Sequence, residues 1–303
     1  MRAFVFPGQG SQSVGMCRDL YDQYPEAKSI FEKADQTLGF ALSKIIFEGP
    51  EEELKKTTVT QPALVTCSTA VLEVLRKRGV AFEAASGHSL GAYSALVASG
   101  VLFFEDAVRL VRHRGELMEQ AGNGKGTMGV ILMLDDALVA QACREASDLG
   151  VVEPANVNCP GQIVISGEKA AVAKALERAK ALGAKRAMEL PVSGPFHSSL
   201  MKSAADGLRE ALTHVQFQKP ILAYYSDTES VKMENPMVIR ESLVRQLVSP
   251  VQWTATVRAM ASDGVDSFVE VGPGKVLTGL IKKIHPGAVV GTAGDASSIL
   301  EWR

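Results

Sequence analysis

A serine between two glycines constrains the fold of this chain more than any other feature. Gly87 and Gly91 flank Ser89 in the segment ASGHSLGAYSAL, residues 85–96. In a G-x-S-x-G elbow the serine occupies a strained turn between a strand and a helix, and side chains at the glycines would collide with neighbouring backbone. A buried strand must therefore precede this turn and a helix must follow it. The alternative is a tight glycine turn with no chemistry.

The flanking sequence supplies the elements that the elbow needs. Residues 82–86 form a weak strand by composition, and residues 89–100 predict a helix of small residues that can pack closely on a sheet. Residues 2–6 predict a buried strand. Residues 60–79 predict a helix with Thr60 as its cap, Pro62 in its first turn and Gly79 at its end. A further helix is predicted over 104–121.

The pattern changes after a glycine-rich linker at residues 121–129. Over 127–193 the order becomes strand, helix, strand, strand, helix, strand, which is typical of a ferredoxin-like unit. Alternating helices and strands then resume. We therefore predict an α/β fold, in which residues 1–126 and 194–303 form a large α/β-hydrolase-like domain with a parallel sheet. Residues 127–193 form a small inserted ferredoxin-like subdomain.

Composition excludes several function classes. A net charge of −2 over 303 residues provides no field that would recruit nucleic acid or an anionic membrane. We find no signal-peptide pattern and no apolar run near the roughly 20 residues of a membrane span, so we expect a cytoplasmic protein. The four cysteines show no CxxC spacing and predict free, mostly buried thiols without a metal site. Nothing demands a subunit partner, and we expect a monomer.

One histidine is placed to serve a nucleophilic serine, which needs a base. His197 lies in PVSGPFHSS, where a predicted strand ends and a helix begins, and ligands bind at such strand exits. His88 precedes the serine, so we expect its side chain on the opposite side of the strand. His113 lies on the polar side of its helix, and the remaining two, His214 and His285, lie near helix ends. A helix-capping neighbour without chemistry is the alternative for His197.

An arginine inside an apolar helix stripe gives independent evidence of a site. Arg114 falls within the stripe formed by Ala107, Leu110, Val111, Leu117 and Met118. A buried cation needs a partner because an unpaired buried charge is costly. The partner is either a buried Asp or Glu in a structural salt bridge, or a substrate carboxylate held bidentately.

Two other glycine loops carry weaker signals. PGQGSQSVG, residues 7–15, does not fit G-x-G-x-x-G and has no P-loop lysine, so it does not indicate a nucleotide site. VGPGK, residues 271–275, predicts a strand-to-helix turn. Lys275 in that turn could meet a phosphate, although a solvated lysine is the more ordinary outcome.

Five motifs in order resemble those of the malonyl-CoA:acyl-carrier-protein transacylase family. They are FVFPGQGSQ, VTQPAL, GHSLG-YSAL, GPFHSSLM and FVEVGPGKVLTGLIKKI, and the resemblance covers essentially the whole chain. It implies that Ser89 is the acylated nucleophile, His197 the base and Arg114 the ligand of the malonyl carboxylate. It implies these further roles: backbone N–H groups of Gln9 and Leu90 in the oxyanion hole, the backbone carbonyl of Gln246 orienting the histidine, and Gln61 and Met118 in the site wall.

The resemblance also implies the reaction and its partners. Malonyl-CoA would acylate the serine, and the phosphopantetheine thiol of acyl carrier protein would then accept the malonyl group, without a metal or bound cofactor. In this family, a bulky residue directly before the histidine, here Phe196, is associated with specificity for malonyl rather than branched malonyl substrates. The family usually has Glu after GHSLG, where this chain has Ala92. Because Ala92 lies outside the implied chemistry, we expect activity to survive.

Three alternatives share much of this sequence pattern. A serine carboxylesterase or thioesterase on the same elbow would release free malonate, although a general lipase has no use for a buried cation. A non-catalytic module would bind carrier protein or coenzyme A without acylation. A transacylase that serves a polyketide pathway would keep every residue named here. Release of malonate without carrier protein, and competition among carrier proteins, would distinguish these possibilities.

Overall fold

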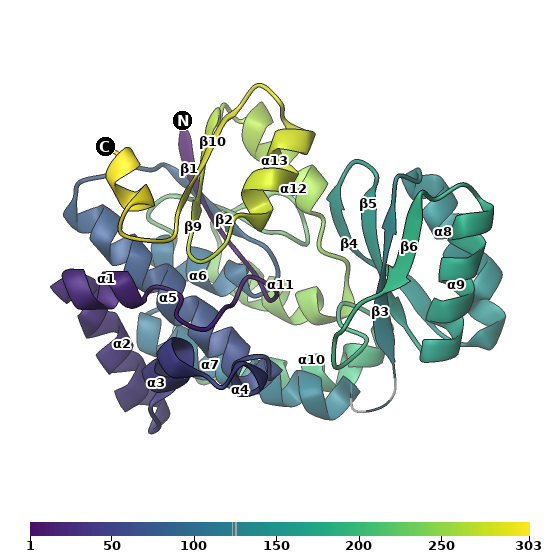
Figure 1. Cartoon of the computed structure of the whole chain (residues 1–303), viewed down its shortest axis with the longest axis horizontal. Helices are drawn as coiled ribbons and strands as arrows, with labels where there is room; N and C mark the ends of the chain where they lie inside the picture. The colour runs from purple at the N-terminus through teal and green to yellow at the C-terminus, as the bar shows by residue number, and fades with distance from the viewer. Residues whose placement is uncertain (123, 125) are drawn as a thin grey trace.

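The computed structural model describes residues 1–303 except residues 123 and 125, which belong to the predicted glycine-rich linker. The linker is therefore only partly within the described residues. Figure 1 shows a larger part that carries both termini and a smaller part on one side of it. In the smaller part, α8 (Asp136–Ala146) and α9 (Lys169–Ala181) cover the outer face of a second sheet.

A six-stranded sheet forms the centre of the larger part. Its strand order is β10-β9-β1-β2-β7-β8, and every pairing is parallel except the antiparallel pair β7-β8. The predicted α/β fold with a parallel sheet is therefore confirmed. The strands are β1 (Arg2–Phe6), β2 (Ala84–Gly87), β7 (Ala223–Tyr225), β8 (Lys232–Met233), β9 (Ser267–Val271) and β10 (Val289–Ala293).

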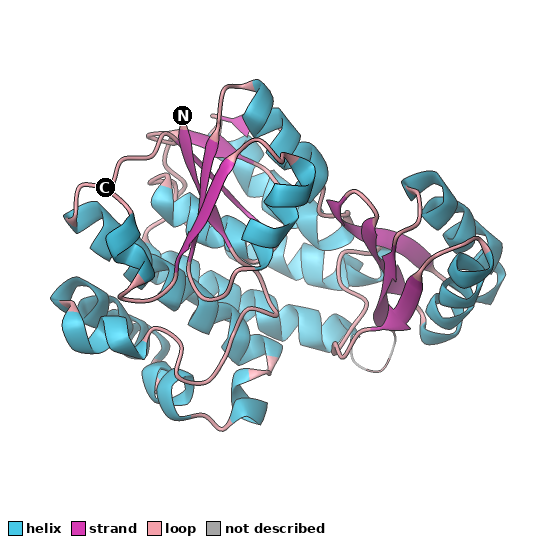
Figure 2. Cartoon of the chain, turned by 45° about the horizontal axis from the view of Figure 1, so that its top comes forward, coloured by secondary structure: helices cyan, strands magenta, loops and turns pink. Residues whose placement is uncertain are grey.

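Helices cover both faces of this sheet, as Figure 2 shows, and alternate residues of β1 point to the two faces. Phe4 and Phe6 pack into the core that includes α5, α6 and α7, whereas Ala3 and Val5 pack against α12 and α13. The helices of the larger part are α1 (Arg18–Gln23), α2 (Pro25–Leu38), α3 (Leu42–Glu48), α4 (Glu51–Leu54), α5 (Thr57–Lys77), α6 (Gly91–Ala98), α7 (Phe104–Gly122), α10 (Lys202–Leu212), α11 (Pro236–Val248), α12 (Trp253–Ser262) and α13 (Val276–Ile284).

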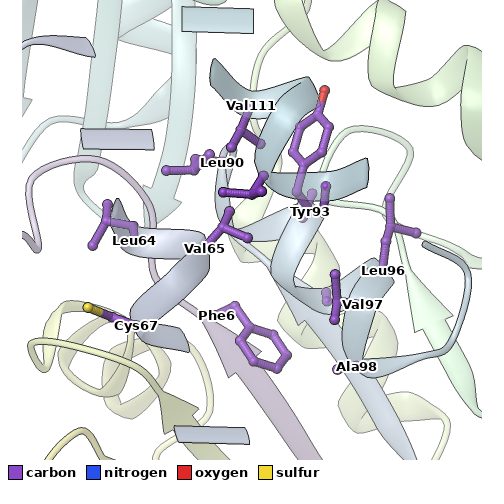
Figure 3. Close-up of a cluster of buried hydrophobic side chains, with 14 of the residues drawn as sticks. Phe6, Leu64, Val65, Cys67, Leu90, Tyr93, Leu96, Val97, Ala98 and Val111 are labelled. Atoms are coloured by element: carbon purple, nitrogen blue, oxygen red, sulfur yellow. The ribbon is translucent and has the colours of Figure 1, made fainter. Parts of the chain in front are cut away.

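Large side chains pack closely around the small residues of α6. Figure 3 shows Phe6 of β1, Val65 of α5, Tyr93 of α6 and Val111 of α7 in this cluster, and all four are fully buried. Every residue of α6 is buried. The small side chains of this helix allow it to lie directly on the sheet, which places its first turn at the end of β2.

The start of α5 differs from the prediction. The helix begins at Thr57, three residues before the predicted start, and Thr60 lies inside it. The Thr60 hydroxyl donates a hydrogen bond to the carbonyl of Leu54, so the prediction that Thr60 caps the helix is wrong. The length and composition of α5 would suit a membrane span, but 89% of its most apolar window is buried inside the protein. It is therefore the core helix of the larger part.

Pro62 lies in the interior of α5 without ending it. A proline has no N–H, so it leaves the carbonyl four residues earlier without an intrahelical donor. That carbonyl belongs to Thr58, and Nη1 of Arg112 donates to it at 2.9 Å. The helix continues through the proline because a side chain from α7 replaces the missing donor.

The smaller part has the predicted order of elements, β3-α8-β4-β5-α9-β6. Its four strands form an antiparallel sheet in the order β4-β5-β3-β6. A parallel bridge between Asn156 and Val251 ties β4 to the larger part just before α12. The strands are β3 (Thr127–Leu132), β4 (Val152–Cys159), β5 (Gln162–Gly167) and β6 (Arg186–Glu189).

Several elements were not predicted, namely α1 to α4, β8 and α12. Helices α1, α3 and α4 have only 4 to 7 residues, too few to show a helical period. Helix α12 carries a signal that sequence reasoning missed, because Trp253, Val257 and Met260 follow i, i+4, i+7 spacing and all are fully buried. The predicted free and buried state of all four cysteines is confirmed.

Candidate active site

Ser89 lies in the strained turn that the elbow motif requires. Its φ is 51°, in the left-handed region that non-glycine residues seldom adopt. A Cβ on Gly87 would lie 2.0 Å from the carbonyl carbon of Gly91, and a Cβ on Gly91 would lie 2.0 Å from the carbonyl oxygen of Phe6. Both glycines are therefore required by close backbone contact, as the sequence predicts.

His197 lies beside Ser89 and is held from its other side. Its Nε2 is 2.8 Å from Oγ of Ser89, and its Nδ1 is 2.8 Å from the backbone carbonyl of Gln246. Since a carbonyl can only accept, Nδ1 carries the proton and Nε2 is free to accept one from the serine. Burial, followed by the charge of Arg114, lowers the pKa of His197 to about 3, so the ring is neutral at physiological pH.

Arg114 is 1% exposed, as its position in the apolar stripe of α7 predicts. Its Nη1 donates to Oε1 of Gln61 at 2.9 Å, and its Nη2 lies 3.2 Å from both Oγ of Ser89 and Oε1 of Gln246. Nε has no partner among the described residues. In the described part of the chain no Asp or Glu forms a salt bridge with this arginine within 4.0 Å, so its hydrogen-bond partners here are neutral groups.

A cavity of about 310 Å³ opens onto these side chains. Ser89, His197 and Arg114 line it, and Phe196 lies in its wall beside the histidine. Of the other predicted site residues, Gln9, Leu90 and Met118 also line the cavity. Gln61 and Gln246 do not line it; they lie directly behind it, in contact with Arg114.

The region around Leu90 favours negative charge. Leu90 is the residue immediately before α6, so its backbone N–H belongs to the positive end of that helix. A thioester carbonyl in the cavity could place its developing oxyanion there. Met118 is 2% exposed, and its sulfur accepts a hydrogen bond from Nε2 of Gln61 at 3.4 Å, which continues the buried layer behind Arg114.

His88 lines the same cavity as Ser89, but its ring meets other partners. Its Nε2 is 2.9 Å from Oδ1 of Asn158 on β4, and the ring packs against Trp253 of α12. The hydroxyl of Ser89 meets His197 and Arg114 instead. Asn156 of β4 lines the cavity as well. The smaller part therefore supplies one wall of the site, which the sequence did not reveal.

Asp227 is a second residue that sequence reasoning missed. It follows β7, is 2% exposed, and accepts hydrogen bonds from the backbone N–H of Ser89 at 2.6 Å and from Nε2 of Gln246 at 2.9 Å. Burial raises the pKa of Asp227 to about 7. The signal available in the sequence was its position directly after the strand-like segment ILAYYS, residues 221–226, because ligand sites form at strand exits in parallel sheets.

The site as a whole is equipped for covalent acyl transfer. It combines a hydroxyl on a strained turn, a neutral imidazole within hydrogen-bond distance, a helix N-terminus for an oxyanion and a buried cation. The unusual component is the cation, because serine hydrolysis by itself does not require one.

Known proteins share both the sequence and the fold. Residues 3–292 match the family described as "Acyl transferase domain". The chain is 51% identical over 284 residues to the malonyl CoA-acyl carrier protein transacylase of Escherichia coli (strain K12), covering 93% of this chain and 92% of that one. It is 48% identical to the protein of the same name from Bacillus subtilis (strain 168), covering 93% and 90%.

Solved structures give the same result. A crystal structure of an acyl carrier protein S-malonyltransferase from Vibrio cholerae aligns with a TM-score of 0.97 at 45% identity, covering 99% of both chains. A malonyl-transacylase solved in complex with a type II PKS acyl-carrier protein aligns with a TM-score of 0.97 at 44% identity, covering 99% of this chain and 97% of that one. The chain belongs to the malonyl CoA-acyl carrier protein transacylase family.

Proposed function

We propose that this protein transfers a malonyl group from malonyl-CoA to the phosphopantetheine thiol of acyl carrier protein. The observation that carries the proposal is the buried guanidinium of Arg114, which lies 3.2 Å from Oγ of Ser89 and has no acidic partner within salt-bridge distance among the described residues. A malonyl thioester carries a free carboxylate on the acyl group that is transferred. Arg114 can hold that carboxylate while the thioester carbonyl lies at the serine.

The first half-reaction is acylation of the serine. Oγ of Ser89 attacks the thioester carbonyl while Nε2 of His197 takes its proton. We assign stabilisation of the oxyanion to the backbone N–H groups of Gln9 and Leu90, both of which line the cavity. The carbon–sulfur bond then breaks, the proton passes from the imidazolium to the coenzyme A thiolate, and a malonyl-serine ester remains.

The second half-reaction runs in the reverse sense. The carrier-protein thiol gives its proton to His197 and attacks the ester, and Ser89 leaves with that proton restored. The backbone carbonyl of Gln246 holds the ring in the required tautomer throughout, since it accepts from Nδ1 at 2.8 Å. Gln61 accepts from the arginine behind the cavity, and Met118 in the cavity wall accepts from Gln61. Side chains and backbone groups of this chain provide every group that the proposed reaction uses.

The position of Phe196 supports the proposal that the transferred group is malonyl and not a branched acyl group. Its side chain lines the cavity directly before His197, where it restricts the space beside the acyl chain. Ala92 is fully buried in the first turn of α6 and makes no contact that this reaction requires. We therefore keep the expectation that the departure at this position leaves the reaction intact.

We infer that the two parts correspond to an α/β-hydrolase-like domain, 1–126 with 194–303, and a ferredoxin-like subdomain, 127–193. The elbow after β2 in a parallel sheet supports the first description, and the strand order β4-β5-β3-β6 supports the second. We propose a monomer, because one chain supplies all the groups of the reaction. We place it in the cytoplasm, where free thiols such as these persist.

Intact-protein mass spectrometry after brief mixing with malonyl-CoA tests the proposal. We expect a malonyl mass increment on the native chain, none on the Ser89→Ala variant, and transfer of the group to holo acyl carrier protein when it is added. Rapid release of malonate without carrier protein would indicate a carboxylesterase instead. No increment, with malonyl-CoA unconsumed, would support a non-catalytic binding module.

Fatty acid synthesis is the pathway we propose, following the names of the relatives. A specific observation supports a second candidate, because one similar structure contains a type II PKS acyl-carrier protein with its malonyl-transacylase. Competition between a fatty acid carrier protein and a polyketide carrier protein for the malonyl group would decide between them. A higher kcat/KM for the polyketide carrier would overturn the fatty acid assignment.

A further inference from the structure

We propose that Asp227 is the buried counter-charge of Arg114 and a positioning residue for Ser89, held one amide group away so that it forms no ion pair with the guanidinium that is to receive an acyl carboxylate. This inference rests on the proposed function, because it concerns how the same site recognises malonyl. It concerns a residue that does not line the cavity. Asp227 therefore acts through its neighbours.

The first part of the argument is the contact with the elbow. Oδ2 of Asp227 accepts the backbone N–H of Ser89 at 2.6 Å. Oδ1 accepts from Nε2 of Gln246 at 2.9 Å, and the same Nε2 donates to the backbone carbonyl of Ser89 at 3.0 Å. The carboxylate and the amide thus hold both backbone polar groups of a residue whose φ is 51°. Such a conformation persists only where its surroundings hold it in place.

The second part is the position of the amide between two buried charges. Oε1 of Gln246 accepts from Nη2 of Arg114 at 3.2 Å, while its Nε2 faces Asp227. The amide dipole therefore has its oxygen toward the cation and its nitrogen toward the carboxylate. Among the described residues neither Arg114 nor Asp227 belongs to a salt bridge, so this amide is the link between them.

The arrangement satisfies two requirements that conflict. A buried cation without any counter-charge is unfavourable, which argues for an acid close by. An acid in direct contact would occupy the guanidinium donors that a substrate carboxylate needs. An intervening amide accepts one hydrogen bond from Nη2 but carries no charge, so it keeps the counter-charge near without forming an ion pair that a substrate carboxylate would have to displace. The negative charge of Asp227 then opposes binding of an anionic acyl group while it stabilises the empty site.

The protonation of Asp227 makes this opposition depend on pH. Burial raises the pKa of this carboxyl to about 7, whereas its hydrogen bonds and Arg114 lower it. Arg114, Tyr93 and Tyr224 are the titratable groups that act on it from α7, α6 and β7. Burial raises the pKa of Tyr93 to about 12 and holds that of Tyr224 well above its usual value, so both tyrosines stay neutral.

The remaining neighbours do not change charge near pH 7. His197, beyond the Gln246 carbonyl, is already neutral because its pKa is about 3. Glu229 lies on the same loop as Asp227 and is ion-paired with Arg245, and its pKa is lowered rather than raised. Asp227 therefore carries its charge above about pH 7 and loses it below. We expect protein with the native Asp227, in a Ser89→Ala background, to bind malonyl-CoA over acetyl-CoA more strongly at low than at high pH.

Two variants and one matched control test the inference, with dissociation constants measured by calorimetry in a Ser89→Ala background. Asp227→Asn removes the charge and keeps the shape, so we expect malonyl-CoA to bind about threefold to tenfold more tightly at high pH while acetyl-CoA is unchanged. The double variant Asp227→Asn, Gln246→Glu moves the charge into direct contact with Arg114. We expect it to weaken malonyl-CoA binding about tenfold or more and to spare acetyl-CoA.

The control is Glu270→Gln, which changes another buried carboxyl that accepts two backbone N–H bonds at α13. It should leave the ratio of the two dissociation constants unchanged. In protein that retains Ser89, Asp227→Asn should slow acylation by both thioesters, because the elbow loses one of its acceptors. A merely structural role would change binding of the two thioesters equally.

Two results would overturn the inference. One is an equal change for both thioesters in the Asp227→Asn variant. The other is a malonyl-to-acetyl binding ratio that does not vary around pH 7 in Ser89→Ala protein with the native Asp227. If the Asp227→Asn variant does not fold, as judged by circular dichroism, this pH series decides alone. Failure of Ser89 to become acylated would count against the proposed function; acylation with an unmoved binding ratio would count against this inference only.

Discussion

Two strand-to-helix corners of the same parallel sheet have nearly the same local design and different chemistry. The elbow joins β2 to α6, and a second corner joins β9 to α13. Both need positive φ angles: 51° at Ser89 in the elbow, and 130° and 90° at Gly272 and Gly274 in the second corner. In the elbow, a residue that carries a side chain adopts the left-handed backbone conformation. In the second corner, the residues with positive φ are glycines, which have no side chain.

A buried acid supports each corner in a different way. Glu270 lies on β9 itself and accepts the N–H groups of Leu277 and Thr278, which caps the helix that follows. Asp227 comes from a different strand and holds the N–H of Ser89. The comparison teaches that the fold supplies the turn, and that reactivity depends on which side chain occupies the positive-φ position and which distant groups meet it.

The elbow has no room for an added side chain at its second glycine. We expect Gly91→Ala to prevent folding or to lower the free energy of unfolding by more than about 4 kcal/mol, because its Cβ would meet the carbonyl oxygen of Phe6 at 2.0 Å. Chemical denaturation measures the effect. A variant that folds with native stability would show that the elbow backbone can move aside.

The second change removes the imidazole at the elbow. We expect His197→Ala to slow the acylation burst by about 10²–10⁴-fold, since no other base lies within hydrogen-bond distance of Oγ of Ser89 among the described residues. His285→Ala, at the end of α13, is the matched control and should acylate at the native rate. Rapid-quench kinetics with malonyl-CoA measures both, and a normal burst without His197 would exclude it as the base.

The third change tests the buried cation beside the elbow, whereas the cation of the second corner, Lys275, is exposed. We expect Arg114→Ala to weaken malonyl transfer by about 2–5 kcal/mol, because the substrate carboxylate would be buried without a partner, and to spare or raise acetyl transfer. Arg109→Ala, five residues earlier on the exposed side of α7, should change neither. The ratio of kcat/KM for the two thioesters is the measurement. Equal losses would contradict a carboxylate-binding role.

The smallest expected effect lies at the second corner. A Cβ on Gly279, inside α13, would meet nothing within 4 Å. We therefore expect Gly279→Ala to stabilise the protein by about 0.5–1 kcal/mol, because alanine loses less backbone entropy in a helix. Thermal unfolding measures this gain. Destabilisation would mean that α13 is strained in a way its backbone does not show.

Local pattern was enough for much of the fold. Strand β1 has the predicted bounds, 2–6, and α7 begins at the predicted residue, 104. The burial of Arg114 followed from helical spacing alone. Thr60 shows the limit of such reasoning, because a good capping residue lies inside a helix that a preceding turn had already begun. Helices α1, α3 and α4 were missed for another reason, since 4 to 7 residues cannot show a period. Helix α2 was missed although its buried residues Ala27, Ile30, Phe31 and Ala34 follow helical spacing.

The elbow, the order of the elements in the smaller part and the burial of Arg114 follow from the amino-acid sequence, because glycine sterics and hydrophobic periodicity act between near neighbours in the chain. The set of groups that meets the serine follows from tertiary contacts. His197 is 108 residues from it, Asp227 is 138 and Gln246 is 157. Parallel strands bring such loops to one edge of the sheet, and no local pattern encodes which hydrogen bonds then form across that distance.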